Sequence, residues 1–155
     1  LFIGDVGQDA IEEIDLIRPN EPGLNFGWAR LEGTRAFSGM APAGATPPVT
    51  EYSHGSGPRQ GNSVTGGYVY RGPVEALQGQ YIFGDFVNGA IWSVPAANLV
   101  QGQTFASSGF TIRTTAFAPP SGQGAINNVA SFGVDAGNNL YIIDFDGEIF
   151  VIEPA

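Results

Sequence analysis

One short pattern occurs three times in this chain, and it constrains the fold more than any other feature. The pattern is an apolar strand that ends in Asp, a turn that contains Gly, and a second apolar strand. Its copies are residues 1–17 (LFIGDVGQDAIEEIDLI), 81–92 (YIFGDFVNGAIW) and 140–152 (LYIIDFDGEIFVI). Asp5, Asp85 and Asp144 fall at the same point of the three copies. Because such a unit cannot bury both of its faces alone, the repetition predicts the stacked sheets of a β-propeller.

Composition also favours β-structure. The chain has 155 residues, with 23 Gly, 11 Pro and only 14% charged residues, which suits short strands and many turns. Residues 12–17 (EEIDLI) also fit one helical turn, but the matching segments of the other copies are rich in β-branched and aromatic residues, so we predict a strand. No run approaches the roughly 20 apolar residues of a membrane-spanning helix, and we expect no membrane span.

The predicted strands group into blades. Residues 63–117 supply four strands and predict one complete blade. Residues 1–54 supply three and lack an inner first strand, and residues 129–154 supply three and lack an outer fourth strand. A closed propeller needs at least about four blades. We therefore predict an all-β fold in which residues 1–155 are part of one propeller. The chain is expected to be a segment of a longer protein. The remaining blades of that protein are then the first partner expected for these residues.

The charge and the absence of cysteine exclude several functions. The net charge is −9, and the six basic residues are all Arg. Binding to a phosphate backbone depends on basic side chains, so nucleic acid is not an expected partner. Zero Cys excludes disulfides, thiolate zinc sites and a cysteine nucleophile. An acidic, Lys-free, Gly-rich β-protein is the composition expected of a periplasmic or secreted protein of bacterial type.

Six motifs in order carry a resemblance to a known family: GDVGQDAIEEIDLI, NFGW, PPVTEYSH, SVTGGYVYRG, YIFGDF and LYIIDFDGEIFVI. They resemble the C-terminal half of the glucose/sorbosone dehydrogenase family, which comprises six-bladed propellers and includes sugar dehydrogenases dependent on pyrroloquinoline quinone (PQQ). The chain is also similar to the propeller of hedgehog-interacting proteins, which bind partners and are not known for sugar oxidation. The resemblance thus implies part of a six-bladed β-propeller.

The resemblance implies PQQ-dependent oxidation of a sugar at its anomeric carbon by the full-length protein. The alternative is a non-catalytic extracellular propeller that binds a protein or a glycan. The catalytic His of the dehydrogenases lies upstream of the part that this chain resembles, so no catalytic residue is expected here. His54 does not match that residue, and we predict a structural role for it.

The resemblance also implies a cofactor site. In the dehydrogenases a calcium ion is held partly by backbone carbonyls of a turn that matches Gly7 and Gln8. The resemblance therefore assigns calcium binding to Gly7, Gln8 and the neighbouring Asp5. It assigns PQQ contacts to Gly7, Gln8, Val87 and Asn88. The dehydrogenases carry a Lys where this chain has Val87 and Asn88. PQQ bears three carboxylates and normally meets cations in its pocket, so this departure favours the hedgehog-interacting type.

The three repeated aspartates have two interpretations. A ring of carboxylates could bind calcium or sugar hydroxyls. Alternatively, each carboxylate accepts hydrogen bonds from the backbone of its own hairpin, as in an Asx turn. We favour the second, because a repeat preserves what its turns need. Asp144, Asp146 and Glu148 also resemble part of a calcium loop, but the other ligand positions are missing.

Four further residues receive structural predictions. For Trp28, beside Gly27, core packing is favoured over a role as a platform for a ligand. Glu12, Glu13 and Asp15 are predicted to form a strand face exposed to solvent.

Overall fold

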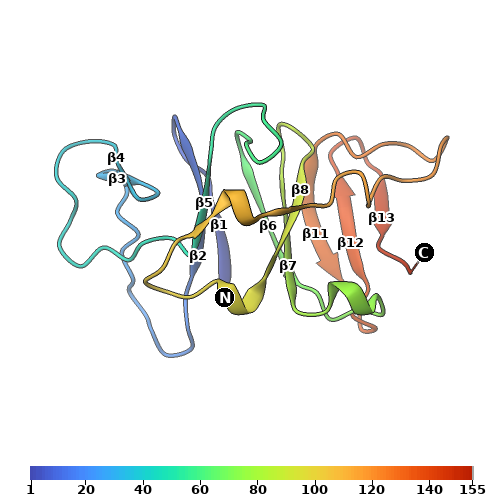
Figure 1. Cartoon of the computed structure of the whole chain (residues 1–155), viewed down its shortest axis with the longest axis horizontal. Helices are drawn as coiled ribbons and strands as arrows, with labels where there is room; N and C mark the ends of the chain where they lie inside the picture. The colour runs from blue at the N-terminus through green and yellow to red at the C-terminus, as the bar shows by residue number, and fades with distance from the viewer. Residues whose placement is uncertain (155) are drawn as a thin grey trace.

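The computed structural model describes residues 1–154 and shows an all-β chain. Three sheets stand side by side in chain order along the longest axis, with a small hairpin beyond the first of them (Figure 1). Residues 1–154 contain no α-helix, and no helix of theirs has the length and apolar composition needed to cross a membrane. These residues form no closed ring.

The first sheet has the strand order β1-β2-β5-β9. Its members are β1 (Phe2–Asp5), β2 (Ile11–Leu16), β5 (Thr50–Ser53) and β9 (Phe105–Ala106). The first three are the strands expected for residues 1–54, and EEIDLI is a strand. The short β9 was not predicted; it comes from a later part of the chain and pairs parallel with β5. The edge of β1 that faces away from β2 has no strand paired with it in residues 1–154.

The second sheet has the order β10-β8-β7-β6. Its members are β6 (Val64–Val69), β7 (Gln80–Asp85), β8 (Ile91–Pro95) and β10 (Thr111–Ile112). The four strands predicted for residues 63–117 are present in the predicted order. The last of them, β10, is much shorter than the predicted strand 109–117. The Ile91 N–H donates to the Thr114 hydroxyl at 2.9 Å instead of to a backbone carbonyl, and a turn follows.

The third sheet has the order β11-β12-β13. Its members are β11 (Val129–Val134), β12 (Leu140–Asp144) and β13 (Ile149–Val151). A separate hairpin pairs β3 (Leu31–Glu32) with β4 (Arg35–Ala36). Single turns of 3-10 helix are η1 (Glu75–Leu77), η2 (Ala96–Asn98) and η3 (Ser107–Gly109).

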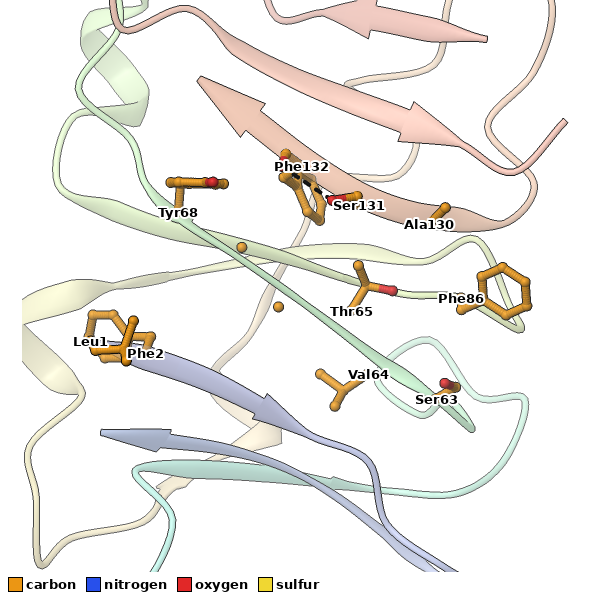
Figure 2. A pocket seen from close by; sticks show the side chains of 12 residues that line it. Leu1, Phe2, Ser63, Val64, Thr65, Tyr68, Phe86, Ala130, Ser131 and Phe132 are labelled. Atoms are coloured by element: carbon orange, nitrogen blue, oxygen red, sulfur yellow. Dashed lines mark hydrogen bonds between the residues drawn. The ribbon is translucent and has the colours of Figure 1, made fainter. Parts of the chain in front are cut away.

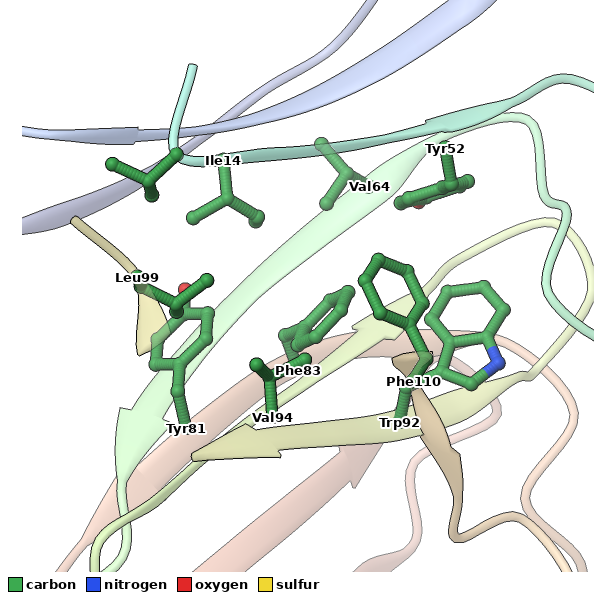
Figure 3. Packing of buried hydrophobic residues seen from close by; sticks show 10 residues of the cluster. Ile14, Tyr52, Val64, Tyr81, Phe83, Trp92, Val94, Leu99 and Phe110 are labelled. Carbon is green, nitrogen blue, oxygen red and sulfur yellow. The ribbon is translucent and has the colours of Figure 1, made fainter. Parts of the chain in front are cut away.

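The core lies between the faces of neighbouring sheets. One cluster fills the space between the first and second sheets, where Tyr52 and Ile14 face Phe83 and Trp92 (Figure 3). Its aromatic rings are in contact, with a centroid distance of 4.9 Å between Tyr52 and Trp92. Full burial of a large apolar side chain stabilises a fold by about 1.5–3 kcal/mol. A second cluster joins the second and third sheets through Ile82 and Ile142, among others. The sheets therefore pack face to face, one after another.

Strand β6 lies between β1 and β11 and is the central strand of the assembly (Figure 2). Its Gly66-Gly67 pair allows other backbone segments to approach closely. A Cβ on Gly67 would lie 1.7 Å from the carbonyl oxygen of Ile82, at a bulge in the pairing with β7. A Cβ on Gly4 in β1 would lie 3.0 Å from the Gly66 nitrogen.

Candidate functional site

The turns that carry the predicted site residues lie at one edge of the sheets, here called the loop edge. It comprises the turns 6–10, 86–90 and 145–148 and the loops 54–63 and 113–128. Side-chain hydrogen bonds tie these segments together: the Asn88 amide donates to the Gly55 carbonyl at 2.9 Å, and the Asn128 amide donates to the Phe86 carbonyl at 2.8 Å. The loop edge is thus continuous from the first sheet to the third.

Asp85, the last residue of β7, is fully buried and fixes the start of β6. Its Oδ2 accepts the backbone N–H groups of Asn62 at 2.7 Å and Ser63 at 2.9 Å. Its Oδ1 accepts the N–H of Asn88 in its own turn at 3.0 Å. The Phe86 N–H returns a bond to the Ser63 carbonyl at 2.8 Å. The carboxylate therefore holds both its own hairpin and the loop that enters the neighbouring strand.

Asp144, the last residue of β12, makes the same arrangement. Its Oδ2 accepts the N–H groups of Asn127 at 2.8 Å and Asn128 at 2.9 Å, and its Oδ1 accepts the Asp146 N–H at 3.2 Å. The Phe145 N–H donates to the Asn128 carbonyl at 3.0 Å. We call this arrangement the aspartate clamp. The Asx-turn interpretation is confirmed for Asp85 and Asp144, but each carboxylate also binds a second segment that the hairpin sequence alone did not reveal.

A sequence signal for the second half of the clamp does exist. In both copies an Asn-x-Val sequence stands before the clamped strand, at residues 62–64 and 127–129. Only a comparison of the two loops, which otherwise differ in length and composition, could have found it.

Asp5, the third repeated aspartate, is exposed, and its carboxylate has no hydrogen bond within residues 1–154. The turn that follows it is held differently, because Glu32 Oε1 accepts the N–H groups of Asp9 at 2.6 Å and Ala10 at 2.8 Å. The Asx-turn interpretation is therefore wrong for Asp5 within the part of the chain that the structure describes.

The predicted cofactor residues lie in two turns of the loop edge. Gly7 and Gln8 are in the turn after β1, and a Cβ on Gly7 would lie 1.8 Å from the Ile11 carbonyl oxygen. Val87 and Asn88 are in the turn after β7, where Val87 is half exposed. The Asn88 amide already donates to the carbonyls of Gly55 and Gln60. Asn88 thus supports a loop rather than presenting a free donor.

The charges of the loop edge do not fit PQQ. A pocket for a trianion needs several cations, yet the clamp aspartates and Glu12 place carboxylates here. Arg59 belongs to this edge, but its Nε donates to the Phe110 carbonyl at 2.9 Å. Calcium suits carboxylates better, since hard cations prefer oxygen ligands. Calcium at Asp5, Gly7 and Gln8 stays a prediction.

Asp144, Asp146 and Glu148 bring one carboxylate oxygen each within 4.8 Å of one another. The oxygens of Asp144 are already taken by the clamp. Acidic groups often lie this close without binding an ion, so the cluster by itself is not evidence of a metal centre.

Glu12 and His54 form a pair beside the clamp of Asp85. His54 Nε2 lies 2.6 Å from Oε1 of the fully buried Glu12, whose Oε2 accepts the Val64 N–H at 2.7 Å. Burial raises the pKa of Glu12, and the hydrogen bonds from Val64 and His54 oppose that rise. The pair joins the end of β5 to the start of β6, which agrees with the structural role predicted for His54.

The prediction that Glu12, Glu13 and Asp15 face solvent is wrong. Glu13 is 6% exposed and Asp15 is fully buried. The hairpin β3–β4 packs over this face of β2, and the Gly33 N–H donates to Glu13 Oε1 at 2.5 Å. Burial and the charges of nearby carboxylates raise the pKa of Glu13 to about 8. Burial and the negative charge of Asp5 raise the pKa of Asp15 to about 7.

The prediction that Trp28 packs in the core is also wrong. Its side chain is 59% exposed and stacks on Phe37 at a centroid distance of 5.0 Å. The segment that carries it leaves the sheets after β2, so no sheet face is available to bury the ring. The sequence around Trp28 has no periodicity that could have shown this.

Comparison with curated proteins finds relatives that include two proteins from Arabidopsis thaliana. The chain is 30% identical over 169 aligned residues to a protein named "HIPL1 protein" and 27% identical over 170 to one named "HIPL2 protein". Each alignment covers 97% of this chain and 24% of the relative, so the chain spans about a quarter of the length of these relatives. No family model and no solved structure matches. The chain is homologous to these two proteins, which supports the hedgehog-interacting side of the sequence resemblance.

Proposed function

We propose that the chain is part of a six-bladed β-propeller that binds a protein or glycan partner and does not oxidise sugar. Under this proposal, residues 1–54, 63–117 and 129–154 belong to three successive blades. The observation that carries the proposal is homology to the two HIPL proteins along 97% of the chain. A periplasmic or secreted location is part of the same proposal.

The chemistry of the loop edge supports a binding role over a quinone site. The positions that would need cations hold Val87 and Asn88, and the Asn88 amide is engaged with loop carbonyls. The clamp carboxylates are also engaged, since they hold backbone N–H groups. These polar groups support the architecture, and propeller loops on such a rigid frame commonly present a binding surface.

Sugar dehydrogenation remains the competing prediction of the family resemblance. No observation on residues 1–154 favours it over binding. It requires groups outside these residues, including the catalytic His that the resemblance places upstream.

Two assays on the full-length protein separate these functions. The first follows sugar-dependent dye reduction with added PQQ and calcium, over several aldoses. The second measures binding to panels of glycans and of extracellular proteins. We expect no dye reduction and saturable binding to at least one panel member. Aldose-dependent turnover that requires PQQ would overturn the proposal.

A further inference from the structure

We propose that Asp5 forms a third aspartate clamp, with a strand of the same polypeptide that precedes Leu1 and pairs with the free edge of β1. This inference extends the proposed propeller and is independent of which partner the propeller binds. In this proposal, the Asp5 carboxylate and the Val6 N–H join the described sheets to the rest of the protein.

The three repeated aspartates occupy equivalent positions. Asp5, Asp85 and Asp144 each end a strand at the same point of the repeat. Two of them are at most 2% exposed, and each accepts two consecutive N–H groups. The third is exposed, and its carboxylate has no hydrogen bond within the described chain. The first copy of the repeat keeps the aspartate, but the Asp5 carboxylate lacks the hydrogen bonds that Asp85 and Asp144 make. We infer that a further segment lies beside Asp5 in the full-length protein.

The backbone next to Asp5 also lacks the hydrogen bond found at the other two aspartates. In the two complete clamps the residue after the aspartate, Phe86 or Phe145, donates its N–H to the clamped loop. Val6 holds that position after Asp5, and its N–H has no backbone partner among residues 1–154. The Asp5 carboxylate and the Val6 N–H thus offer the same kinds of acceptor and donor that the other two clamps use, without partners among residues 1–154.

A groove with a volume of about 590 Å³ lies along β6, between β1 and β11. Leu1 and Phe2 line it on the side of β1, and Phe132 lines it on the side of β11 (Figure 2). Leu1 is 76% exposed, whereas its equivalents Tyr81 and Leu140 are fully buried. Tyr81 lies in the cluster between the first and second sheets, and Leu140 lies in the cluster between the second and third sheets. The free edge of β1 lacks such a strand.

The position of the missing strand in the chain follows from the two complete clamps. The N–H groups that they hold precede the aspartate by 22 and 23 residues at Asp85 and by 16 and 17 at Asp144. The same spacing from Asp5 falls before Leu1. Each alignment covers 24% of the relative, so the relatives contain sequence outside the aligned region. The missing strand would run antiparallel to β1, as β6 runs to β7.

The test uses hydrogen exchange of the full-length protein followed by mass spectrometry. Asp5→Asn is compared with Asp9→Asn, a matched control at an exposed aspartate of the same turn. An Asn supplies one acceptor oxygen where the clamp uses two. We expect Asp5→Asn to speed amide exchange in residues 2–6 and in the segment before Leu1 by about tenfold or more, and Asp9→Asn to leave both unchanged. Asp85→Asn should act in the same way on residues 62–64.

A measurement on the unmodified full-length protein covers the case in which Asp5→Asn fails to fold. The Val6 amide should be protected from exchange without added calcium. Exchange of Val6 at the rate of an unstructured peptide would overturn the proposal. Protection that appears only with calcium would assign Asp5 to a metal site instead. A dimer that Asp5→Asn dissociates would show that a second copy occupies the edge, which also overturns it.

Discussion

The hydroxyl of Tyr52 in β5 donates a 2.9 Å hydrogen bond to Oδ2 of Asp85 in β7, and this buried bond joins the first sheet to the second. Asp85 Oδ2 therefore serves three donors at once: this hydroxyl and the N–H groups of Asn62 and Ser63. Burial and the neighbouring carboxylate both raise the pKa of Tyr52, so the phenol stays a donor at any ordinary pH.

Tyr52→Phe removes this bond and leaves the ring in place. We expect the free energy of unfolding to fall by about 1–3 kcal/mol, because a hydrogen bond to a buried charge is lost. Urea denaturation measures the change. The matched control is Tyr141→Phe, which removes a 3.1 Å bond to the exposed Asp135 and should have a much smaller effect, because water replaces the lost partner. Equal effects of the two substitutions would contradict the importance given to the buried bond.

Stability should fall as the pH rises from about 4 to about 8. The pKa values of Glu13 and Asp15 are raised by burial in the folded protein, to about 8 and about 7. The folded state therefore binds more protons than the unfolded state in this window, and the free energy of unfolding decreases with increasing pH. This contribution is fully present below the unfolded pKa values and is lost as the pH passes the folded ones.

Asp15→Asn should flatten this pH dependence and make the protein more stable than the wild type at pH 8, by at least about 1 kcal/mol. Denaturation at pH 5 and pH 8 measures both effects. Asp9→Asn, at an exposed position, should keep the wild-type slope. A wild-type stability that increases between pH 5 and pH 8 would show that these carboxylates ionise freely in the folded state.

Gly67→Ala should destabilise the protein by about 1–3 kcal/mol or more, because the new methyl would meet the Ile82 carbonyl oxygen at 1.7 Å. Gly133→Ala in β11 is the control, since a Cβ there meets nothing within 4 Å. Thermal unfolding of both variants gives the comparison. Wild-type stability of Gly67→Ala would mean that β6 pairs with β7 without this bulge.

The two tryptophans should respond differently to a soluble quencher. Trp28 is 59% exposed and Trp92 is fully buried. Trp92→Phe should leave red-shifted emission that acrylamide quenches strongly, and Trp28→Phe should leave blue-shifted emission that resists quenching. In the full-length protein, protection of Trp28 would show that another segment or a partner covers it.

The sequence predicted the strands that carry a clear apolar pattern and missed the features that depend on short or aperiodic segments. The strands of the three repeat copies were found because apolar residues and the aspartate recur at fixed spacing. The burial of Glu13 and Asp15 was missed because it depends on the aperiodic segment after β2, which brings Gly33 onto Glu13. The two-residue β9 was missed because so short a run carries no pattern. For the aspartate clamp, the bond within the hairpin was predicted. The bonds to the preceding loop were missed, because that loop is separate in sequence from the hairpin.

The central claim is that this loop edge supports a binding protein and holds no quinone site. The most direct measurement is a titration of PQQ, with calcium present, into the full-length protein, followed by calorimetry and by the absorption of the quinone. The proposal predicts no saturable binding and no spectral change, because carboxylates dominate the edge and Asn88 is engaged with loop carbonyls. Saturable PQQ binding that Asn88→Ala weakens would contradict it.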